Sequence, residues 1–204
     1  MNAKKVLYVH GMGGSAAEAE QYGNILGQDV IGLDYNDYRP WVTKETVLEK
    51  YRELKEPGIE VEIIANSIGA WFTMLALGEE EVSRAYFISP MVDMEKFITG
   101  MMAREGVTEE ELRAKGEIPT KFGQPLSWEY LTFVRENPIT WNVPTAVLYG
   151  SGDFLVPYDT MRAFTEAHAM KLTVMDGGEH WFLTPEQMAF LTRWLKENAN
   201  ISSR

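Results

Sequence analysis

The sequence lacks cysteine entirely, which excludes disulfide bonds, thiolate zinc sites and a cysteine nucleophile. Basic residues are relatively few, because 19 of them against 30 acidic residues give a formal net charge of −11. An acidic surface repels phosphate backbones and anionic headgroups, so we expect neither nucleic acid nor a membrane surface as a partner. Long apolar runs are missing too, since the most apolar stretch, 68–77, is about half as long as a membrane-spanning helix. His10 and Gly11 interrupt the first apolar run too early for a secretory signal, so we expect a cytoplasmic protein.

The 204 residues fit one domain, and 45% apolar with 24% charged residues is typical of a folded globular chain. Short apolar runs rich in β-branched residues alternate with longer amphipathic segments, which predicts β-α-β units and a mostly parallel sheet. We therefore expect an α/β fold. The predicted strands cover 5–10, 30–34, 61–66, 84–89, 145–149 and 171–175, and the predicted helices cover 16–26, 44–55, 67–77, 157–168 and 185–198.

One long segment, at about 93–143, interrupts this alternation between the fourth and fifth predicted strands. It is much longer than the dozen or so residues that a simple crossover needs. The sequence predicts helices over 94–104, 108–115 and 128–137, and a short hairpin turn at Phe122-Gly123-Gln124. Because an insertion with its own elements usually covers an active site or binds a partner, we expect a single domain, 1–204, with a cap insertion.

The first chemical motif is Ala65-Asn66-Ser67-Ile68-Gly69, which joins the third predicted strand to the next helix. It has the pattern of a nucleophile elbow with Ala65 in place of the first glycine. A sharp turn of this kind exposes the Ser67 hydroxyl, and the free amides of the following helix favour an anion beside it. The alternative is that Ser67 only caps the helix.

The second motif, residues 10–15, is a glycine cluster after the first predicted strand. Glycines let the backbone amides turn toward the space above the sheet, which an oxyanion hole requires. We assign its two donors to the N–H groups of Met12 and Ile68. A phosphate-binding loop is the alternative, but Gly-Lys-Ser/Thr and the third glycine of a dinucleotide fingerprint are both absent. We expect His10 to be a buried histidine that supports the loop.

Two further motifs supply a base and an acid for a serine nucleophile. Of the three histidines, His10 lies in the glycine cluster and His168 lies in a predicted helix, which leaves His180 as the base. Asp153 follows the fifth predicted strand, and we predict that it orients His180. The remaining candidates for the acid are Asp176 and Glu179.

With the order Ser67, Asp153, His180, each after a strand, the sequence resembles the α/β-hydrolase superfamily through almost its whole length outside the insertion. The resemblance implies a three-layer fold with a mostly parallel sheet of about six strands. The insertion occurs where that superfamily usually has its cap, and it is more distantly similar to small carboxylesterases of the cinnamoyl-esterase type. Similar small lipases and esterases also carry alanine at the position of Ala65.

The resemblance implies a serine hydrolase that cleaves a small carboxylic ester through an acyl-enzyme, without a metal or cofactor. Thioester cleavage, amide or peptide cleavage and a lyase step would use the same groups, and a non-catalytic binding protein is a further alternative. The acidic runs at 79–81 and 109–111 either hold a substrate ammonium group, as in aminopeptidases, or form solvated surface. The sequence leaves monomer and homodimer equally open.

Aromatic and apolar side chains near these motifs and in the insertion predict the walls of a substrate pocket. For Trp71, four residues after Ser67, the alternative is that it packs its helix under the sheet. The predicted pocket residues are Met12, Trp71, Phe122, Trp128, Phe154 and Trp181.

Overall fold

A six-stranded parallel sheet lies at the centre of the computed structural model, which describes residues 3–121 and 123–199. Its strands are β1 (Ala3–Val9), β2 (Ile31–Gly32), β3 (Ile59–Asn66), β4 (Arg84–Ile88), β7 (Thr145–Gly150) and β8 (Lys171–Met175). Their order across the sheet is β2-β1-β3-β4-β7-β8, and every neighbouring pair is parallel. After a polar first residue, β4 and β7 read as nearly continuous apolar runs because both faces of these strands are buried. The predicted sheet is confirmed.

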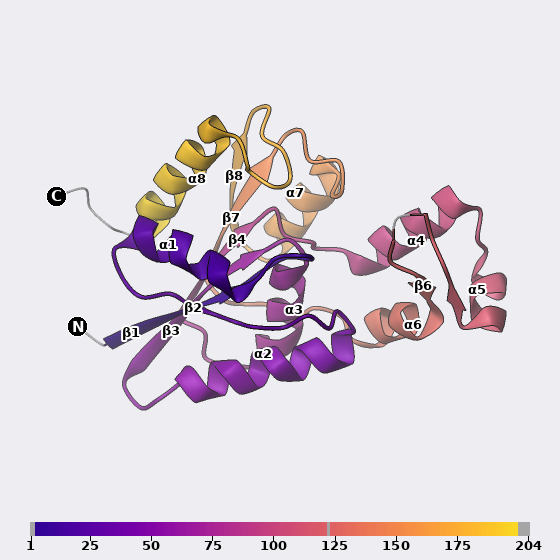
Figure 1. Ribbon diagram of the computed structural model, residues 1–204, viewed down its shortest axis with the longest axis horizontal. Coiled ribbons are helices and arrows are strands. Elements are labelled where there is room, and N and C mark those ends of the chain that lie inside the picture. Colours follow the sequence, from indigo (N-terminus) through magenta and orange to yellow (C-terminus); the bar gives the residue numbers. More distant parts are fainter. Residues whose placement is uncertain (1–2, 122, 200–204) are drawn as a thin grey trace.

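Helices cover both faces of the sheet (Figure 1). On one face, Tyr22 of α1 and Trp194 of α8 pack in one buried cluster. On the other face, Tyr51 of α2, Phe72 of α3 and Met161 of α7 pack in a second buried cluster, which confirms the three-layer fold. These helices are α1 (Ala19–Leu26, after a 3-10 turn at Ala16–Glu18), α2 (Pro40–Leu54), α3 (Ile68–Leu77), α7 (Tyr158–Ala167) and α8 (Pro185–Asn198). No helix in the described part of the chain is long and apolar enough to cross a membrane.

Most predicted boundaries are right within two residues, and two elements differ for local reasons. The second strand covers only Ile31–Gly32 instead of 30–34, because this edge strand pairs with β1 over two positions before the chain leaves the sheet. Helix α2 begins at Pro40, four residues before the predicted start at Lys44. Proline fits a first helical turn, where its missing N–H would have no partner in any case.

The chain reverses its direction of travel across the sheet between β1 and β3. From β1 it passes to β2 on one side, and it returns to β3 on the other side of β1. Helices α1 and α3, which follow these two strands, pack on opposite faces of the sheet. The carboxyl ends of β1 and β3 therefore form the switch point at which open parallel sheets bind their ligands.

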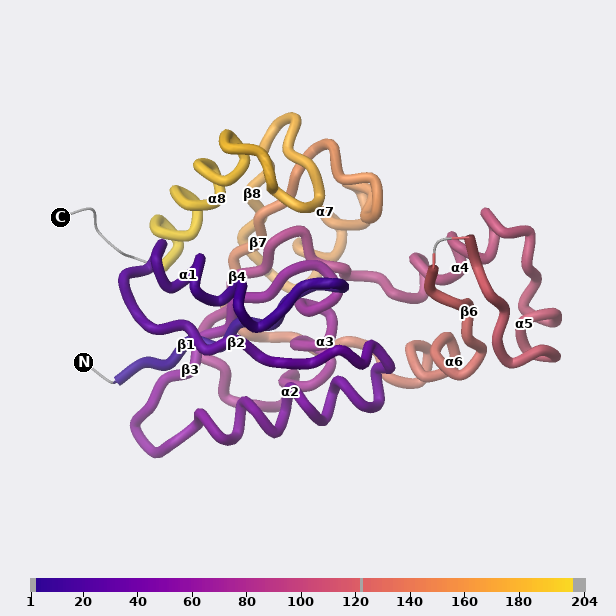
Figure 2. Tube along the Cα trace, viewed as in Figure 1, coloured from indigo at the N-terminus to yellow at the C-terminus, as the bar shows by residue number. Residues whose placement is uncertain are grey.

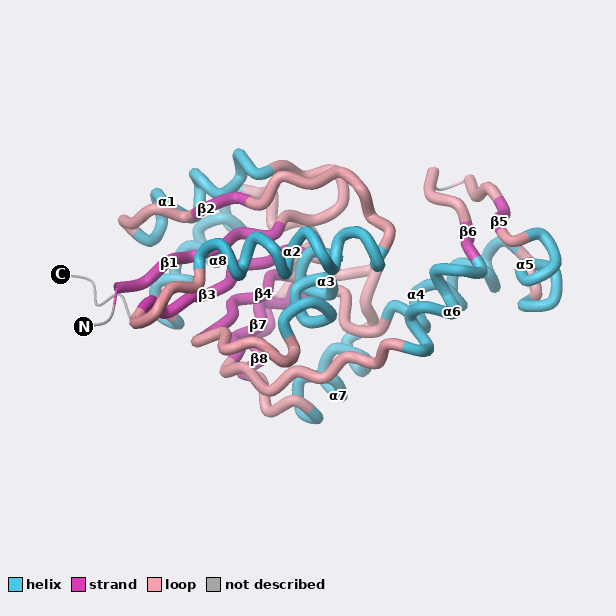
Figure 3. Tube along the Cα trace, turned by 90° about the horizontal axis from the view of Figure 1, so that it is seen from below, coloured by secondary structure: helices cyan, strands magenta, loops and turns pink. Residues whose placement is uncertain are grey.

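The insertion projects beyond the carboxyl ends of the strands (Figures 1 and 2). Figure 3 shows it as a separate lobe beside the sheet. The predicted helices are confirmed within one or two residues, and Ile118 pairs with Leu126 in an antiparallel hairpin. The predicted turn residue Phe122 lies outside the described residues. The elements are α4 (Met94–Glu105), α5 (Glu109–Lys115), β5 (Glu117–Ile118), β6 (Leu126–Ser127) and α6 (Trp128–Glu136).

Helix α6 attaches the insertion to the core through aromatic rings. Tyr130 of α6 stacks on Trp71 of α3 at 6.2 Å between ring centroids. Trp41 of α2 contacts Tyr130 edge-on at 6.4 Å and Phe133 at 5.8 Å. Aromatic pairs of this kind stabilise a fold by more than the apolar area that they bury. We call the rings of Trp41, Trp71, Tyr130 and Phe133 the aromatic seam between the insertion and the core.

Candidate active site

The turn between β3 and α3 holds Ser67 in a strained conformation. Its φ of 51° and ψ of −122° lie where side-chain-bearing residues are rare. The Ser67 N–H donates to the carbonyl of Ile88 at 3.0 Å, and the Ser67 carbonyl accepts from the N–H of Met91, also at 3.0 Å. Within the described chain, the Ser67 hydroxyl caps no helix amide. The geometry therefore favours the elbow over the simple helix cap.

Ser67, His180 and Asp153 form a continuous hydrogen-bonded chain. Nδ1 of His180 lies 2.7 Å from Oδ2 of Asp153, and Nε2 of His180 lies 2.8 Å from Oγ of Ser67. Because a carboxylate only accepts, Nδ1 carries the proton and Nε2 is left to accept from the serine hydroxyl. The His180 and Asp153 residues are only 3% and 8% exposed. This arrangement can remove a proton from Ser67.

Asp153 is anchored by the backbone of its own loop. Its Oδ1 accepts from the N–H groups of Leu155 at 2.8 Å and Val156 at 3.2 Å, which leaves Oδ2 for His180. The other two candidates for the acid lie elsewhere: Asp176 is exposed and accepts from the Ser151 hydroxyl at 3.2 Å, and Glu179 is also exposed. Of the three carboxylates considered, the structure brings Asp153 to His180.

The glycine cluster lies directly beside Ser67. A Cβ on Gly11 would lie 3.3 Å from Cβ of Ser67, and one on Gly69 would lie only 2.3 Å from the carbonyl oxygen of His10. This close approach explains why small residues surround the turn. Among the residues described, neither the Met12 nor the Ile68 N–H donates to a protein acceptor. Both amides are thus available to a ligand, and their role as an oxyanion hole stays a prediction.

His10 is fully buried, as the sequence predicted. Its Nδ1 donates to the carbonyl of Gly11 at 2.8 Å, and its ring stacks on Tyr35 at 4.1 Å. The Tyr35 hydroxyl donates in turn to the carbonyl of His10 at 2.5 Å. His168 lies elsewhere, with Nδ1 bonded to the carbonyl of Trp141 at 3.0 Å. These contacts leave His180 as the histidine that contacts Ser67.

A polar network connects the two halves of the switch point, and the sequence analysis missed it. The Tyr8 hydroxyl donates to Oε2 of Glu18 at 2.5 Å, and Nδ2 of Asn66 donates to Tyr8 at 3.1 Å and to Tyr22 at 3.0 Å. Oε1 of Glu18 accepts from the N–H of Ser15 in the glycine cluster at 3.0 Å. The Ser15-x-x-Glu18 spacing of a capping box was the one signal that pointed toward it.

Burial keeps the two tyrosines of this network protonated. Desolvation is the main cause that raises the pKa of Tyr8 far above its ordinary value, and the nearby Tyr22 and Glu18 raise it further. Desolvation likewise raises the pKa of Tyr22 to about 12. Both tyrosines therefore remain protonated, and Tyr8 remains a donor to Glu18.

Three of the predicted pocket residues are exposed at the mouth of the site. Met12 is 47% exposed, Phe154 is 62% exposed and Trp181 is 57% exposed. The Phe154 and Trp181 rings lie 5.5 Å apart, and Trp181 contacts the ring of His180 edge-on at 5.5 Å. Apolar side chains thus border the histidine on its open side.

The other predicted pocket residues have different surroundings. Trp71 is 2% exposed and packs in the aromatic seam against Tyr130 of the insertion, and its role as a pocket wall stays a prediction. Trp128 is half-buried against the core. Phe122 lies outside the described residues.

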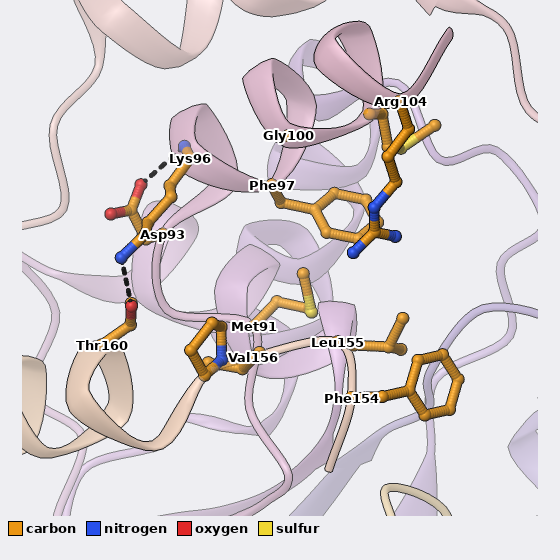
Figure 4. A pocket seen from close by; sticks show the side chains of 12 residues that line it. Met91, Asp93, Lys96, Phe97, Gly100, Arg104, Phe154, Leu155, Val156 and Thr160 are labelled. Carbon is orange, nitrogen blue, oxygen red and sulfur yellow. Dashed lines mark hydrogen bonds between the residues drawn. The ribbon is translucent and has the colours of Figure 1, made fainter.

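A cavity of about 200 Å³ opens between α4 and the loop that follows Asp153 (Figure 4). The residues of α4 that line this cavity were not predicted, because the hydrophobic pattern of the helix does not show which of its faces meets that loop. The lining residues are Met91, Asp93, Lys96, Phe97, Gly100, Met101, Arg104, Phe154, Leu155, Val156, Pro157 and Thr160. Over residues 3–121 and 123–199, no three histidine, aspartate or glutamate side chains lie close enough together to hold a metal ion.

The two acidic runs are partly ion-paired at the surface. Glu80 pairs with Arg52 at 2.7 Å, and Glu109 pairs with Arg135 at 2.5 Å. Glu111 pairs with Lys115 at 2.6 Å. This pairing favours solvated surface over a binding site for a substrate ammonium group.

Comparisons with known proteins find the fold but no close relative in sequence. No protein-family model matches the chain, and no curated protein matches it by sequence. The chain is similar in structure to Est1E from Butyrivibrio proteoclasticus, with a TM-score of 0.73, 17% identity and coverage of 98% of this chain and 88% of that one. It is also similar to α/β hydrolase domain-containing protein 10 from mouse, with a TM-score of 0.73, 19% identity and coverage of 98% and 90%. The esterase domain of a Rhodothermus marinus protein has a TM-score of 0.66, 16% identity and coverage of 97% and 86%.

Proposed function

We propose that this chain, which has the α/β-hydrolase fold, is a serine hydrolase that cleaves a small carboxylic ester. The observation that carries the proposal is the hydrogen-bonded chain from Ser67 through His180 to Asp153. Structural neighbours that are named esterases support it. A cytoplasmic location belongs to the same proposal, and the lack of cysteine is compatible with a reducing compartment.

In the proposed reaction, Oγ of Ser67 attacks the ester carbonyl while Nε2 of His180 takes the hydroxyl proton. The N–H groups of Met12 and Ile68 donate to the oxyanion of the tetrahedral intermediate. The protonated His180 then gives its proton to the leaving alcohol, and an acyl group remains on Ser67. Water, deprotonated by Nε2 of His180, attacks this acyl group, and the protonated His180 then returns the proton to Oγ of Ser67 as the acid leaves. Asp153 holds Nδ1 of His180 and stabilises the imidazolium in both steps.

We further propose that the insertion, 93–143, is the cap of this site. It projects beyond the carboxyl ends of the strands, where Ser67 and His180 lie. Its helix α4 forms one wall of the cavity, and the loop after Asp153 forms the other. The apolar rings of Phe154 and Trp181 fit the carbon skeleton of an acyl or alcohol group. For comparison, Est1E is known with ferulic acid bound.

Labelling with a fluorophosphonate tests the nucleophile without knowledge of the substrate. We expect one adduct on the wild-type protein and none on Ser67→Ala, measured as intact mass. Ser151→Ala is the matched control, because Ser151 is an exposed serine that follows β7. Among the residues described, its hydroxyl bonds only to the Asp176 carboxylate and the N–H of Gly177. It should label like the wild type. A folded wild-type protein that takes no adduct would contradict the proposal and favour a binding protein.

Measuring kcat/KM on matched esters, thioesters and amides then shows which class of substrate the protein prefers. All three use the same nucleophile and base, so selectivity depends on the pocket. We expect the highest kcat/KM on small carboxylic esters. A higher kcat/KM on thioesters or amides would mean that the ester is the wrong substrate class, although Ser67 would still be the nucleophile.

A further inference from the structure

The cavity between α4 and the loop after Asp153 adjoins the candidate catalytic groups. Met91, on its wall, donates its N–H to the carbonyl of Ser67 at 3.0 Å. Phe154, on the opposite side, directly follows Asp153 and contacts Trp181. Ser67, Asp153 and His180 do not line the cavity themselves, but residues bonded or adjacent to Ser67 and Asp153 do, so it is the space in which we place one end of the ester.

Most of the cavity wall is apolar, and three of its residues carry charge. The Asp93 carboxylate accepts from the backbone N–H of Lys96 at 2.9 Å, where it caps α4. The Lys96 ammonium donates to the Thr160 hydroxyl at 2.5 Å, as Figure 4 also shows. Both of these charged groups thus have partners within the protein.

Arg104, the third charged residue, has no such partner. Among the residues described, no carboxylate or other acceptor contacts its guanidinium, although the chain carries 11 more acidic than basic residues. Arg135, also in the insertion, pairs with two carboxylates. In Figure 4 the Arg104 guanidinium points from α4 toward Phe97 and Leu155. It therefore presents unused hydrogen-bond donors to an apolar cavity.

We propose that Arg104 binds a carboxylate at the far end of the substrate, so that the preferred esters are monoesters of dicarboxylic acids. This inference rests on the proposed ester hydrolysis. A guanidinium matches a carboxylate with two parallel hydrogen bonds. Arg104 is itself exposed, so water partly screens this pair, and apolar walls such as Phe97 and Met101 accommodate the carbon chain between the two carbonyl groups.

A pair of chromogenic esters of equal length tests the proposal. Mono-4-nitrophenyl adipate carries the carboxylate, and 4-nitrophenyl hexanoate replaces it with a methyl group. We expect the ratio of their kcat/KM values, adipate over hexanoate, to fall about tenfold or more in Arg104→Gln, because a charge-assisted hydrogen bond is lost. Raising the salt concentration should also narrow the difference in this ratio between the wild type and Arg104→Gln, which a purely structural role for Arg104 does not predict.

Arg113→Gln is the matched control, because Arg113 is an exposed arginine of the insertion that does not line the cavity. It should keep the wild-type ratio. If hexanoate is hydrolysed through Ser67 and the ratio is the same in wild type and Arg104→Gln, the carboxylate subsite is wrong and the serine hydrolase stands.

If the wild type hydrolyses neither ester and takes no fluorophosphonate, the proposed function is wrong. Whether Arg104 forms a carboxylate-binding subsite is then tested by measuring the binding of adipate. Titration calorimetry with adipate then compares the wild type with Arg104→Gln. Binding that Arg104→Gln loses supports the subsite. Equal binding to both proteins, or binding to neither, overturns it.

Discussion

The switch point and the insertion are held together by different interactions. At the switch point, the chain around Ser67 and the glycine cluster is fixed by buried hydrogen bonds and by backbone contacts that leave no room for a Cβ. The insertion is held by the aromatic seam and by exposed ion pairs of Arg135. Reacting atoms need fixed positions, whereas a cap can vary with the substrate. This fold therefore separates the region of the proposed chemistry from the region that we propose selects the substrate.

The largest effect should come from the catalytic chain at the switch point. Ser67→Ala and His180→Ala should each lower kcat by roughly three orders of magnitude or more, because the members of a triad act as a unit. Steady-state hydrolysis of a 4-nitrophenyl ester measures this loss, with circular dichroism to show that the variants fold. A Ser67→Ala protein that kept a tenth of the wild-type kcat would show that Ser67 is not the nucleophile.

Two glycine-to-alanine substitutions test the difference in packing directly. Gly69→Ala places a Cβ 2.3 Å from the His10 carbonyl oxygen, and we expect it to lower the free energy of unfolding by about 1 to 3 kcal/mol. Gly100→Ala in α4 is the control from the insertion, because a Cβ there meets nothing within 4 Å. It should raise the free energy of unfolding by up to about 1 kcal/mol. Urea denaturation measures both, and equal effects would contradict the contrast between the regions.

Glu18→Gln tests whether the polar network positions the glycine cluster. The amide keeps the shape but weakens the bonds to Tyr8 and to the N–H of Ser15, so we expect kcat to fall about tenfold while KM changes little. Glu20→Gln, at an exposed position two residues later, serves as the control and should match the wild type. A fall in stability without a change in kcat would show that Glu18 only supports the fold.

The smallest effect should come from the ion pairs of the insertion. Arg135→Ala removes contacts to Glu95 and Glu109, and we expect the free energy of unfolding to fall by no more than about 1 kcal/mol, because partly exposed ion pairs contribute little. Thermal unfolding in low and high salt measures it, and the difference from wild type should shrink in high salt. A loss as large as that of Gly69→Ala would mean that the insertion is held as tightly as the switch point.

Much of the candidate site was predictable because each of its groups directly follows a strand. The apolar runs that end at Val9, Asn66, Gly150 and Met175 identify parallel strands, and parallel strands bring their carboxyl ends to one edge. Because Ser67 and the glycine cluster both follow such strands, they are expected to lie at the same edge of the sheet, even when no side-chain contact is known. The sequence by itself thus determined the sheet, the helices of the insertion and the residues from which a catalytic chain is drawn.

Only the tertiary structure decided which side chains meet across distant elements. Glu18 contacts Tyr8, and Tyr8 contacts Asn66, across three separate elements. Trp71 is buried in the aromatic seam, and Arg104 faces a loop about 50 residues further along the chain. The local pattern shows that a helix has an apolar face, but the packing partner of that face depends on how whole elements fit together. These contacts therefore could not be predicted from periodicity or spacing, because they arise from the packing of surfaces that the sequence places far apart.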